Sequence, residues 1–283
     1  MTAVLLALLA AAAYGSSDFA GGIAAARLAP WTVSMISNTV GGLTCLIASI
    51  WVGGTLTGAD LGWSLLAGVG NMVGTSALYR GMNAGRMGVV APVSGVGAAV
   101  LPALVGILGG ERPGTVVWVG LVLALPAIWL VASEPATLEP SPAQRSGLAA
   151  GVVDGLVAGC GFGVLLLGLA QTSDGARLLP LATNQLTAAA LVAALGTVLR
   201  IPWRPRRERA PLAALAGLLG TAATGSFLAA TKHGYLTVTA VITSLYPATT
   251  VLLAAVVLRE RVHRPQAVGL ALCAVAVALV AAG

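Results

Sequence analysis

Charged side chains are what this sequence lacks most. Only 8% of its 283 residues are Asp, Glu, Lys or Arg, while 58% are hydrophobic, and the mean hydropathy is +0.94. Soluble globular proteins carry about 25% charged residues, so this chain has too few to cover itself with a hydrated surface. The composition excludes a soluble enzyme, a nucleic-acid-binding module and a disordered tail protein. It predicts an all-α, polytopic integral membrane protein.

Histidine and cysteine are also scarce, with two and three residues respectively. His233 and His263 lie near the ends of predicted helices, and Cys45, Cys160 and Cys273 all fall inside apolar stretches without a Cys-x-x-Cys motif. We interpret the cysteines as small core residues rather than disulfide partners or metal ligands. We therefore expect no metal site and no cofactor.

Several enzyme motifs are missing as well. No phosphate-binding loop of the form GxxxxGK[ST] occurs, which excludes ATP-driven transport by this chain alone. No GxSxG with a usable histidine occurs, which argues against an intramembrane serine hydrolase. Asp154-Gly155 hints at a lipid phosphotransferase, but the further metal-binding aspartates of such an enzyme are absent.

Apolar runs dominate what is present. Ten of them are long enough to cross a bilayer as helices at 1.5 Å per residue. No basic residue precedes the first run, so we interpret it as a spanning helix and not as a signal peptide. The gaps are too short for a soluble domain. The ten predicted spans are 2–25, 30–52, 61–80, 87–109, 114–132, 147–170, 178–199, 211–231, 236–258 and 264–282.

An internal repeat is the most informative pattern. A Glu-Arg pair followed, after seven intervening residues, by Gly-Leu occurs twice. It occupies Glu111, Arg112, Gly120 and Leu121 and again, 149 positions later, Glu260, Arg261, Gly269 and Leu270. The repeat predicts a first five-helix unit at 1–132, a linker at 133–146 and a second unit at 147–283. Because five is odd, the two units enter the membrane from opposite sides, as in the inverted repeats of many secondary transporters.

Basic residues predict the orientation. Twelve of the fifteen lie in gaps on one side of the membrane, and three, Arg112, Arg177 and Lys232, lie on the other. The positive-inside rule places the twelve in the cytoplasm and both termini outside. The arginine run between Arg200 and Arg209 either has this topogenic role or binds anionic lipid.

Two further motifs accompany the repeat. Tyr14-Gly15-Ser16-Ser17-Asp18-Phe19 lies in the first run, and Ser244-x-Tyr246-Pro247 lies in the ninth. With the Glu-Arg pairs, the helix count and the loop lengths, they resemble the drug/metabolite transporter superfamily, specifically its ten-helix EamA-like family. The resemblance covers the whole chain. It implies secondary transport, often export, through a central cavity lined by helices 1–4 and 6–9, with helices 5 and 10 peripheral. It also implies cytoplasmic termini, opposite to the charge count.

Two carboxylates, Asp18 and Asp154, lie deep inside predicted spans, where ionisable groups are functional hypotheses by default. Asp18 shares a helix face with Tyr14 and Ser17, because Ser17 and Asp18 follow Tyr14 by three and four residues. A carboxylate beside an aromatic ring can bind a cation or exchange a proton for a substrate. The alternative is a local hydrogen bond. Asp154 shares its face with small residues that favour close helix packing, so it either reaches the substrate or contacts a neighbouring helix.

Uncharged polar and aromatic residues complete the candidate site. Buried amides must find partners, which are either a substrate or another helix. The substrate-binding candidates are Tyr14, Ser17, Asp18, Phe19, Asn38, Asn71, Tyr79, Ser94, Asp154, Phe162, Asn184, Phe227, Ser244 and Tyr246. Pro92 and Pro247 lie within predicted helices and are candidate hinges, because each removes a backbone donor. The Glu-Arg pairs lie at helix ends. Each pair either belongs to a structural loop or forms a gating salt bridge.

The sequence therefore predicts a secondary transporter that moves a small metabolite or drug-like molecule by alternating access, with proton-coupled export as one form. The alternative is a non-transporting membrane protein, either a lipid-modifying enzyme or a scaffold. Expected partners are the substrate, protons and membrane lipids, with the chain a monomer or homodimer. We expect it in a bacterial inner membrane.

Overall fold

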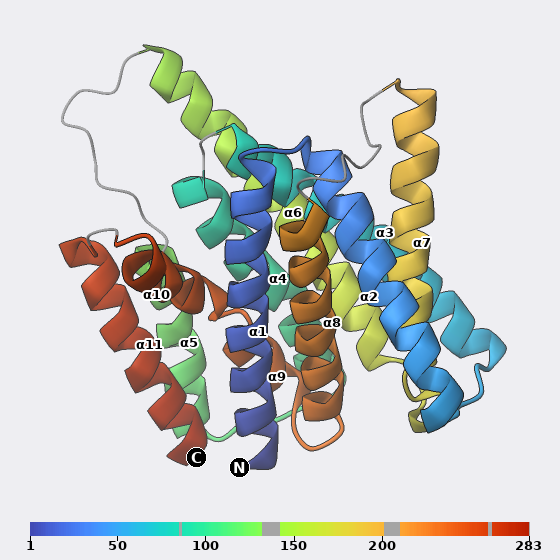
Figure 1. The fold of residues 1–283 in the computed structure, drawn as a ribbon. Helices are drawn as coiled ribbons and strands as arrows, with labels where there is room; N and C mark the ends of the chain where they lie inside the picture. Colours follow the sequence, from blue (N-terminus) through green and yellow to red (C-terminus); the bar gives the residue numbers. More distant parts are fainter. Residues whose placement is uncertain (85–86, 132–141, 201–209, 260–261, 283) are drawn as a thin grey trace.

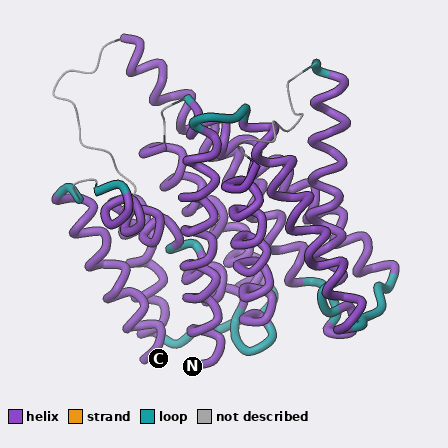
Figure 2. The backbone as a smooth tube through the Cα atoms, viewed as in Figure 1, coloured by secondary structure: helices purple, strands orange, loops and turns teal. Residues whose placement is uncertain are grey.

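The computed structural model describes residues 1–84, 87–131, 142–200, 210–259 and 262–282, and these residues form helices joined by short loops (Figures 1 and 2). The helices are α1 (Thr2–Ala25), α2 (Pro30–Val52), α3 (Gly58–Asn83), α4 (Met87–Leu108), α5 (Thr115–Val131), α6 (Pro142–Ala170), α7 (Leu179–Val198), α8 (Ala210–Thr231), α9 (Leu236–Thr243), α10 (Tyr246–Val257) and α11 (Arg264–Ala282), with a 3₁₀ turn η1 (Asp174–Ala176).

The all-α class is confirmed, and each predicted span coincides with helix. Among the described residues, seven helical stretches are long and apolar enough to cross a membrane, and two apolar helices are shorter. The boundaries differ most at α6, which begins at Pro142 inside the predicted linker. Large apolar side chains cover the outside of the bundle; Trp51 and Ile50, for example, are 87% and 76% exposed. Such a surface suits contact with lipid rather than water.

The ninth predicted span is the one that does not form a single helix. It is divided into α9 and α10 at Ser244 and Leu245, and the two pieces point in different directions (Figure 1). Pro247 occupies the first turn of α10. It has no N–H to offer the carbonyl group of Thr243 four residues earlier, so the helical ladder is interrupted at this point.

Helix packing follows the repeat. α1 starts at the end of the bundle where the N-terminus lies, whereas α6 starts at the opposite end (Figure 1). In chain order, the first unit consists of α1 to α5, and the second consists of α6, α7, α8, the α9–α10 pair and α11. With the units aligned in this order, the major helix contacts come in matched pairs. α3 packs on α6 as α8 packs on α1, and α4 packs on α6 as the α9–α10 pair packs on α1. α2 packs on α7, and α5 on α11. This is the arrangement expected of two inverted units.

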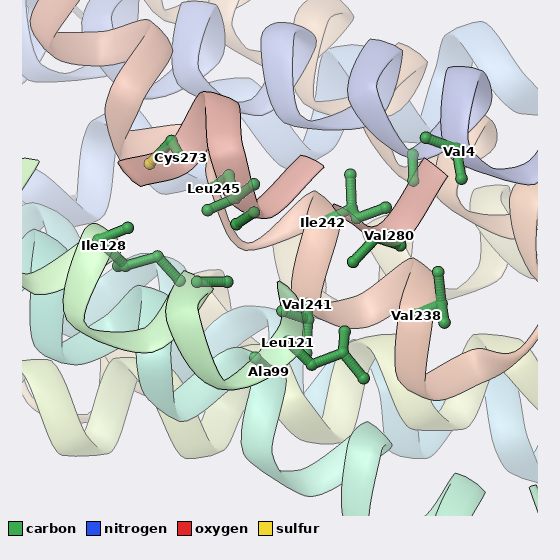
Figure 3. Packing of buried hydrophobic residues seen from close by; sticks show 14 of the residues in the cluster. Val4, Ala99, Leu121, Ile128, Val238, Val241, Ile242, Leu245, Cys273 and Val280 are labelled. Atoms are coloured by element: carbon green, nitrogen blue, oxygen red, sulfur yellow. The ribbon is translucent and has the colours of Figure 1, made fainter. Parts of the chain in front are cut away.

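The largest apolar cluster holds one side of the bundle together. It brings Val4 of α1, Leu121 of α5, Val241 of α9 and Val280 of α11 into one core (Figure 3). Cys273 belongs to it and Cys45 lies in another cluster, as predicted for core residues. The prediction was wrong for Cys160, which is exposed on α6.

Glycines allow the helices around the centre to approach closely. A Cβ atom on Gly161 of α6 would lie 2.5 Å from the backbone nitrogen of Gly74 on α3. A Cβ atom on Gly217 of α8 would lie 2.3 Å from the carbonyl oxygen of Ser37 on α2. Small residues serve the same purpose in membrane helix interfaces generally. These contacts bring polar side chains of the two halves together.

Candidate functional site

Two cavities meet at the centre of the bundle. The larger chamber, about 60 Å³, is lined by residues of α1, α2, α3, α6, α7 and α8. The smaller chamber, about 30 Å³, lies between α1, α4, α6 and the break between α9 and α10. Tyr14, Asp18, Phe162 and Leu165 border both chambers. Neither wall includes α5 or α11, which agrees with the expected peripheral position of the fifth and tenth spans.

Among the residues that the structure describes, Asp18 is the one carboxylate that borders the chambers. It is 8% exposed and makes no hydrogen bond or ion pair with the residues that the structure describes. Tyr14 lies one turn earlier on α1, and Ser17 precedes Asp18 and also lines the larger chamber. The predicted common face of α1 is therefore the one that faces the cavity. Burying an unpaired carboxylate is costly, so this side chain is the first candidate for function.

Three of the four tyrosines surround Asp18. Tyr14 and Tyr79 line the larger chamber, and Tyr246 lines the smaller one. The rings of Tyr14 and Tyr246 are 6.2 Å apart between centroids and tilted by 54°. The hydroxyl of Tyr14 bonds Thr224 on α8 at 2.8 Å, and that of Tyr246 bonds Ser94 on α4 at 2.9 Å. Aromatic faces and hydroxyls thus border the carboxylate from both halves of the chain.

The predicted asparagines form a single hydrogen-bonded group. Asn71 of α3 donates to the side-chain oxygen of Asn38 on α2 at 2.9 Å and to that of Asn184 on α7 at 3.0 Å. Asn38 and Asn71 line the larger chamber, whereas Asn184 lies behind them and is fully buried. The group joins the two halves and also presents one amide surface to the cavity. Both interpretations of the buried amides, helix contact and cavity lining, apply here.

Asp154 is buried away from the chambers. It pairs with Arg80 of α3, whose Nε lies 2.9 Å from Asp154 Oδ1 and whose Nη2 contacts the same oxygen. The pair spans the seam between α3 and α6. Of the two roles considered for Asp154, the structure shows the contact with a neighbouring helix and places the side chain outside both cavities.

The remaining candidates divide between cavity and wall. Phe162 and Ser244 border a chamber. Phe19 borders neither, and Phe227 is fully buried in an apolar cluster. Ser94 lies in the wall and is reached through Tyr246. The other predicted hinge, Pro92, lies in α4, and its side chain is outside the described residues.

Residues of the smaller chamber include two buried hydroxyls without a partner in the described part of the chain. These are Thr243 Oγ1 and Ser244 Oγ, at the break between α9 and α10. The break therefore places polar groups with unused hydrogen-bonding capacity beside the cavity. Pro247 was the feature of the sequence that signalled this break between α9 and α10.

At the end of the bundle near both termini, hydrogen bonds join the two halves. The Glu111 carboxylate accepts hydrogen bonds from the backbone N–H groups of Leu236 at 2.6 Å and Thr237 at 2.9 Å, at the start of α9. Of the two roles considered for this motif, the first copy has a structural one. The second copy, Glu260 and Arg261, lies outside the described residues.

Asp60, in the first turn of α3, makes a second cross-half contact at this end. Its carboxylate accepts bonds from Ser173 N–H at 2.7 Å and from the Thr57 hydroxyl at 2.7 Å. The Ser173 N–H, followed by the bonds from Thr57, holds the pKa of the Asp60 carboxyl well below its usual range. Both acids fix loops between halves and lie outside the chambers.

Sequence reasoning missed two polar cavity residues, Ser37 and Thr224, which line the larger chamber. Gln185, which the sequence offered together with Asn184 as a polar pair, lines the same chamber. Ser37 adjoins the predicted Asn38, so the polar pair Ser37-Asn38 was the available signal. Thr224 had no such signal, because threonine is common in apolar helices.

The arrangement can bind a polar ligand and hold a proton on one carboxyl group. Within the described residues no cluster of three His, Cys, Asp or Glu side chains lies close enough to hold a metal ion. Asp18 and the surrounding hydroxyls are the acid–base groups among the described residues that line the chambers.

Comparison with known proteins gives a family match and a solved structure of similar fold. A family model described as the EamA-like transporter family matches residues 1–133 and 149–282, in two parts. No curated protein matches. A solved structure titled "Crystal structure of protein" is 17% identical and has a TM-score of 0.75, with 98% of this chain and 95% of that chain covered. That likeness shows the fold alone.

Proposed function

The chain belongs to the EamA-like transporter family, a family of membrane transporters and not of enzymes, and we propose that it is a secondary transporter in which Asp18 couples substrate movement to protons. As a multi-pass integral membrane protein it carries a small molecule through the two chambers by alternating access. The single observation that supports this proposal most is the buried, unpaired Asp18 carboxylate at the junction of both chambers.

The coupling follows from competition for one carboxylate. A protonated Asp18 is neutral and leaves no charge to hold a cationic or donor-rich substrate. An ionised Asp18 attracts such a substrate, because opposite charges attract strongly in a cavity of low dielectric constant. Proton and substrate then occupy the chamber in turn, which converts a proton gradient into substrate movement. The partners we propose are the substrate, protons and membrane lipids, with the chain a monomer or homodimer in a bacterial inner membrane.

The inverted repeat and the break at Ser244 support alternating access. Two units related by a twofold axis can tilt in opposite directions about a central site. The bonds from Glu111 and Asp60 join the two halves at one end of the bundle. Relative tilting of the halves would expose the chambers to each side of the membrane in turn. Pro247 at the helix break is the proposed hinge.

Flux measurements on purified protein in liposomes test the proposal. An imposed pH gradient is combined with a panel of organic cations, amino acids and sugars, and proton movement is followed by a pH-sensitive dye. We expect substrate-dependent proton movement in the wild type and in Asp174→Asn, a control acid whose side chain is 83% exposed in the 3₁₀ turn η1. We expect it to disappear in Asp18→Asn. Proton movement that persists unchanged in Asp18→Asn would remove this residue from coupling.

A further inference from the structure

Many hydroxyl and amide groups line the larger chamber, and the bonds that they make within the wall determine what remains for a ligand. Four hydroxyl protons are donated to backbone carbonyls at 2.7–2.9 Å: Ser17 to Ala216, Ser37 to Ala213, Thr75 to Asn71 and Thr224 to Gly220. A hydroxyl has one proton and two lone pairs. These four groups therefore offer a ligand only acceptor capacity.

The bond that Thr224 donates to Gly220 also fixes the direction of the bond between Tyr14 and Thr224. Because the Thr224 proton is committed to Gly220, the Tyr14 hydroxyl is the donor in the 2.8 Å bond between them. Tyr14 thus also faces the chamber with an unused lone pair and no free proton. Tyr79 interacts with the Ser37 side chain, whose own proton is committed to Ala213.

The asparagine group is fixed by its outer members. The amide nitrogen of Asn38 bonds the carbonyl oxygen of Ser34, and that of Asn184 bonds the carbonyl oxygen of Leu181, each at 2.9 Å. Both side chains therefore direct their oxygens at Asn71, which donates its two amide protons to them. The side-chain oxygen of Asn71 is left without a partner in the described part of the chain.

Gln185 adds one more free acceptor. Its amide nitrogen donates to Thr221 at 2.7 Å, which leaves the side-chain oxygen and a single N–H. The described wall of the chamber contains no Lys, Arg or His, and Arg80 at the end of α3 is paired with Asp154. Among the described residues, the groups left for a ligand are thus two carboxylate oxygens, two amide oxygens and the remaining hydroxyl lone pairs, set against one amide N–H.

We infer that the larger chamber binds a small primary ammonium ion, with Asp18 as its counter-ion and the oxygens of Asn71 and Gln185 as further acceptors. An alkylammonium group has three N–H donors and no acceptor, which complements this wall. The aromatic rings of Tyr14 and Phe162 line the chamber, and a ring face turned to a cation would favour the same charge. A carboxylate on the ligand would meet Asp18 with no cation to offset it. The inference rests on the proposed function, since it names the substrate class of that site.

The volume limits the size of the ligand. A water molecule needs about 10–15 Å³ of cavity on this scale, so a chamber of about 60 Å³ holds a ligand of roughly five non-hydrogen atoms. The chamber in this conformation therefore suits a short amine better than a bulky drug.

A series of probes of matched size tests the inference. n-Butylammonium, tetramethylammonium, propionate and 1-butanol each have about five non-hydrogen atoms and differ in charge and in donors. Binding of each to the purified full-length protein in detergent is measured by calorimetry. The variants are Asp18→Asn, Asp18→Glu and the control Asp174→Asn, and each variant's folding is checked by its thermal unfolding midpoint.

We expect n-butylammonium to bind at least about tenfold more tightly than the other three probes. Its affinity should fall by about tenfold or more in Asp18→Asn, and remain in Asp18→Glu and Asp174→Asn. Equal or tighter binding of tetramethylammonium would overturn the inference, because that ion has the charge without the donors. Preference for propionate or 1-butanol, or displacement of the amine by an equal concentration of Na⁺, would overturn it too.

The failures of the two proposals are distinguishable. Amine binding without proton-coupled flux would leave the inference and remove the proposed coupling. Coupled flux of a different substrate, with no amine binding in the same preparation, would leave the transporter and remove the ammonium assignment.

Discussion

Two buried aspartates show that location in a span does not determine the role of a side chain. Asp18 and Asp154 are 8% and 4% exposed. Asp154 has a guanidinium partner, whereas Asp18 faces a cavity without one. The first arrangement stabilises the seam between α3 and α6, and the second leaves a carboxylate free for a ligand or proton. The Asp→Asn variants at these two positions should therefore differ in their effect on the stability of the protein.

Asp154→Asn is expected to lower the stability of the protein, and Asp18→Asn is expected to leave it unchanged or raise it. The first substitution breaks an ion pair at a buried carboxylate. The Arg80 side chain is 60% exposed, so solvent screening reduces the cost to about 1–2 kcal/mol. The second removes no hydrogen bond and relieves a buried charge. Thermal unfolding in detergent measures both, and a larger loss for Asp18→Asn than for Asp154→Asn would contradict this assignment.

At the scale of helices, close contacts between glycines decide how near the two halves approach. α3 and α6 meet at Gly74 and Gly161, where backbone packs against backbone. The same two helices carry Tyr79 and Phe162, which border the larger chamber. The width of the chamber therefore depends on this seam.

Gly161→Ala is expected to separate α3 from α6 and to destabilise the protein, although alanine favours a helix by about 1 kcal/mol over glycine. The added Cβ would lie 2.5 Å from Gly74 N and 2.7 Å from Gly70 O, so backbone must move. Gly62→Ala on α3 is the matched control, because its Cβ would have no neighbour within 4 Å. Unfolding midpoints should fall for Gly161→Ala and stay level or rise for Gly62→Ala. Equal midpoints would show that the seam is not tightly packed.

Helix positions were predictable from the sequence because apolar length alone fixes a membrane span. The partner of each polar side chain was not. Asp154 and Arg80 are 74 positions apart, and Asn71 and Asn184 are 113 apart, so only the packing of inverted repeats brings them together. The face of α1 with Tyr14 and Asp18 was predictable from helical spacing. The break at Ser244 was signalled by Pro247, but a proline alone does not distinguish a kink from a division into two helices.

At the scale of the whole molecule, the two halves form one bundle with matched contacts and central cavities. α1 pairs with α8 as α3 pairs with α6, and residues of both halves line the two chambers. Bonds at Glu111 and Asp60 join the halves at the end that carries the termini. The charge count predicts that this end lies outside the cytoplasm, and that orientation stays a prediction.

Alternating exposure of the chambers is the central claim, and two-sided labelling of Ser17→Cys tests it most directly. The variant is made after Cys45, Cys160 and Cys273 are replaced by serine, and a membrane-impermeant maleimide is applied to right-side-out and inside-out vesicles. Leu9→Cys on α1 is the control, because Leu9 is 55% exposed on the apolar surface. We predict that Ser17→Cys reacts from both sides, with rates that change with pH, while Leu9→Cys stays unlabelled. Reaction from one side only at every pH, or from neither side, would contradict alternating access.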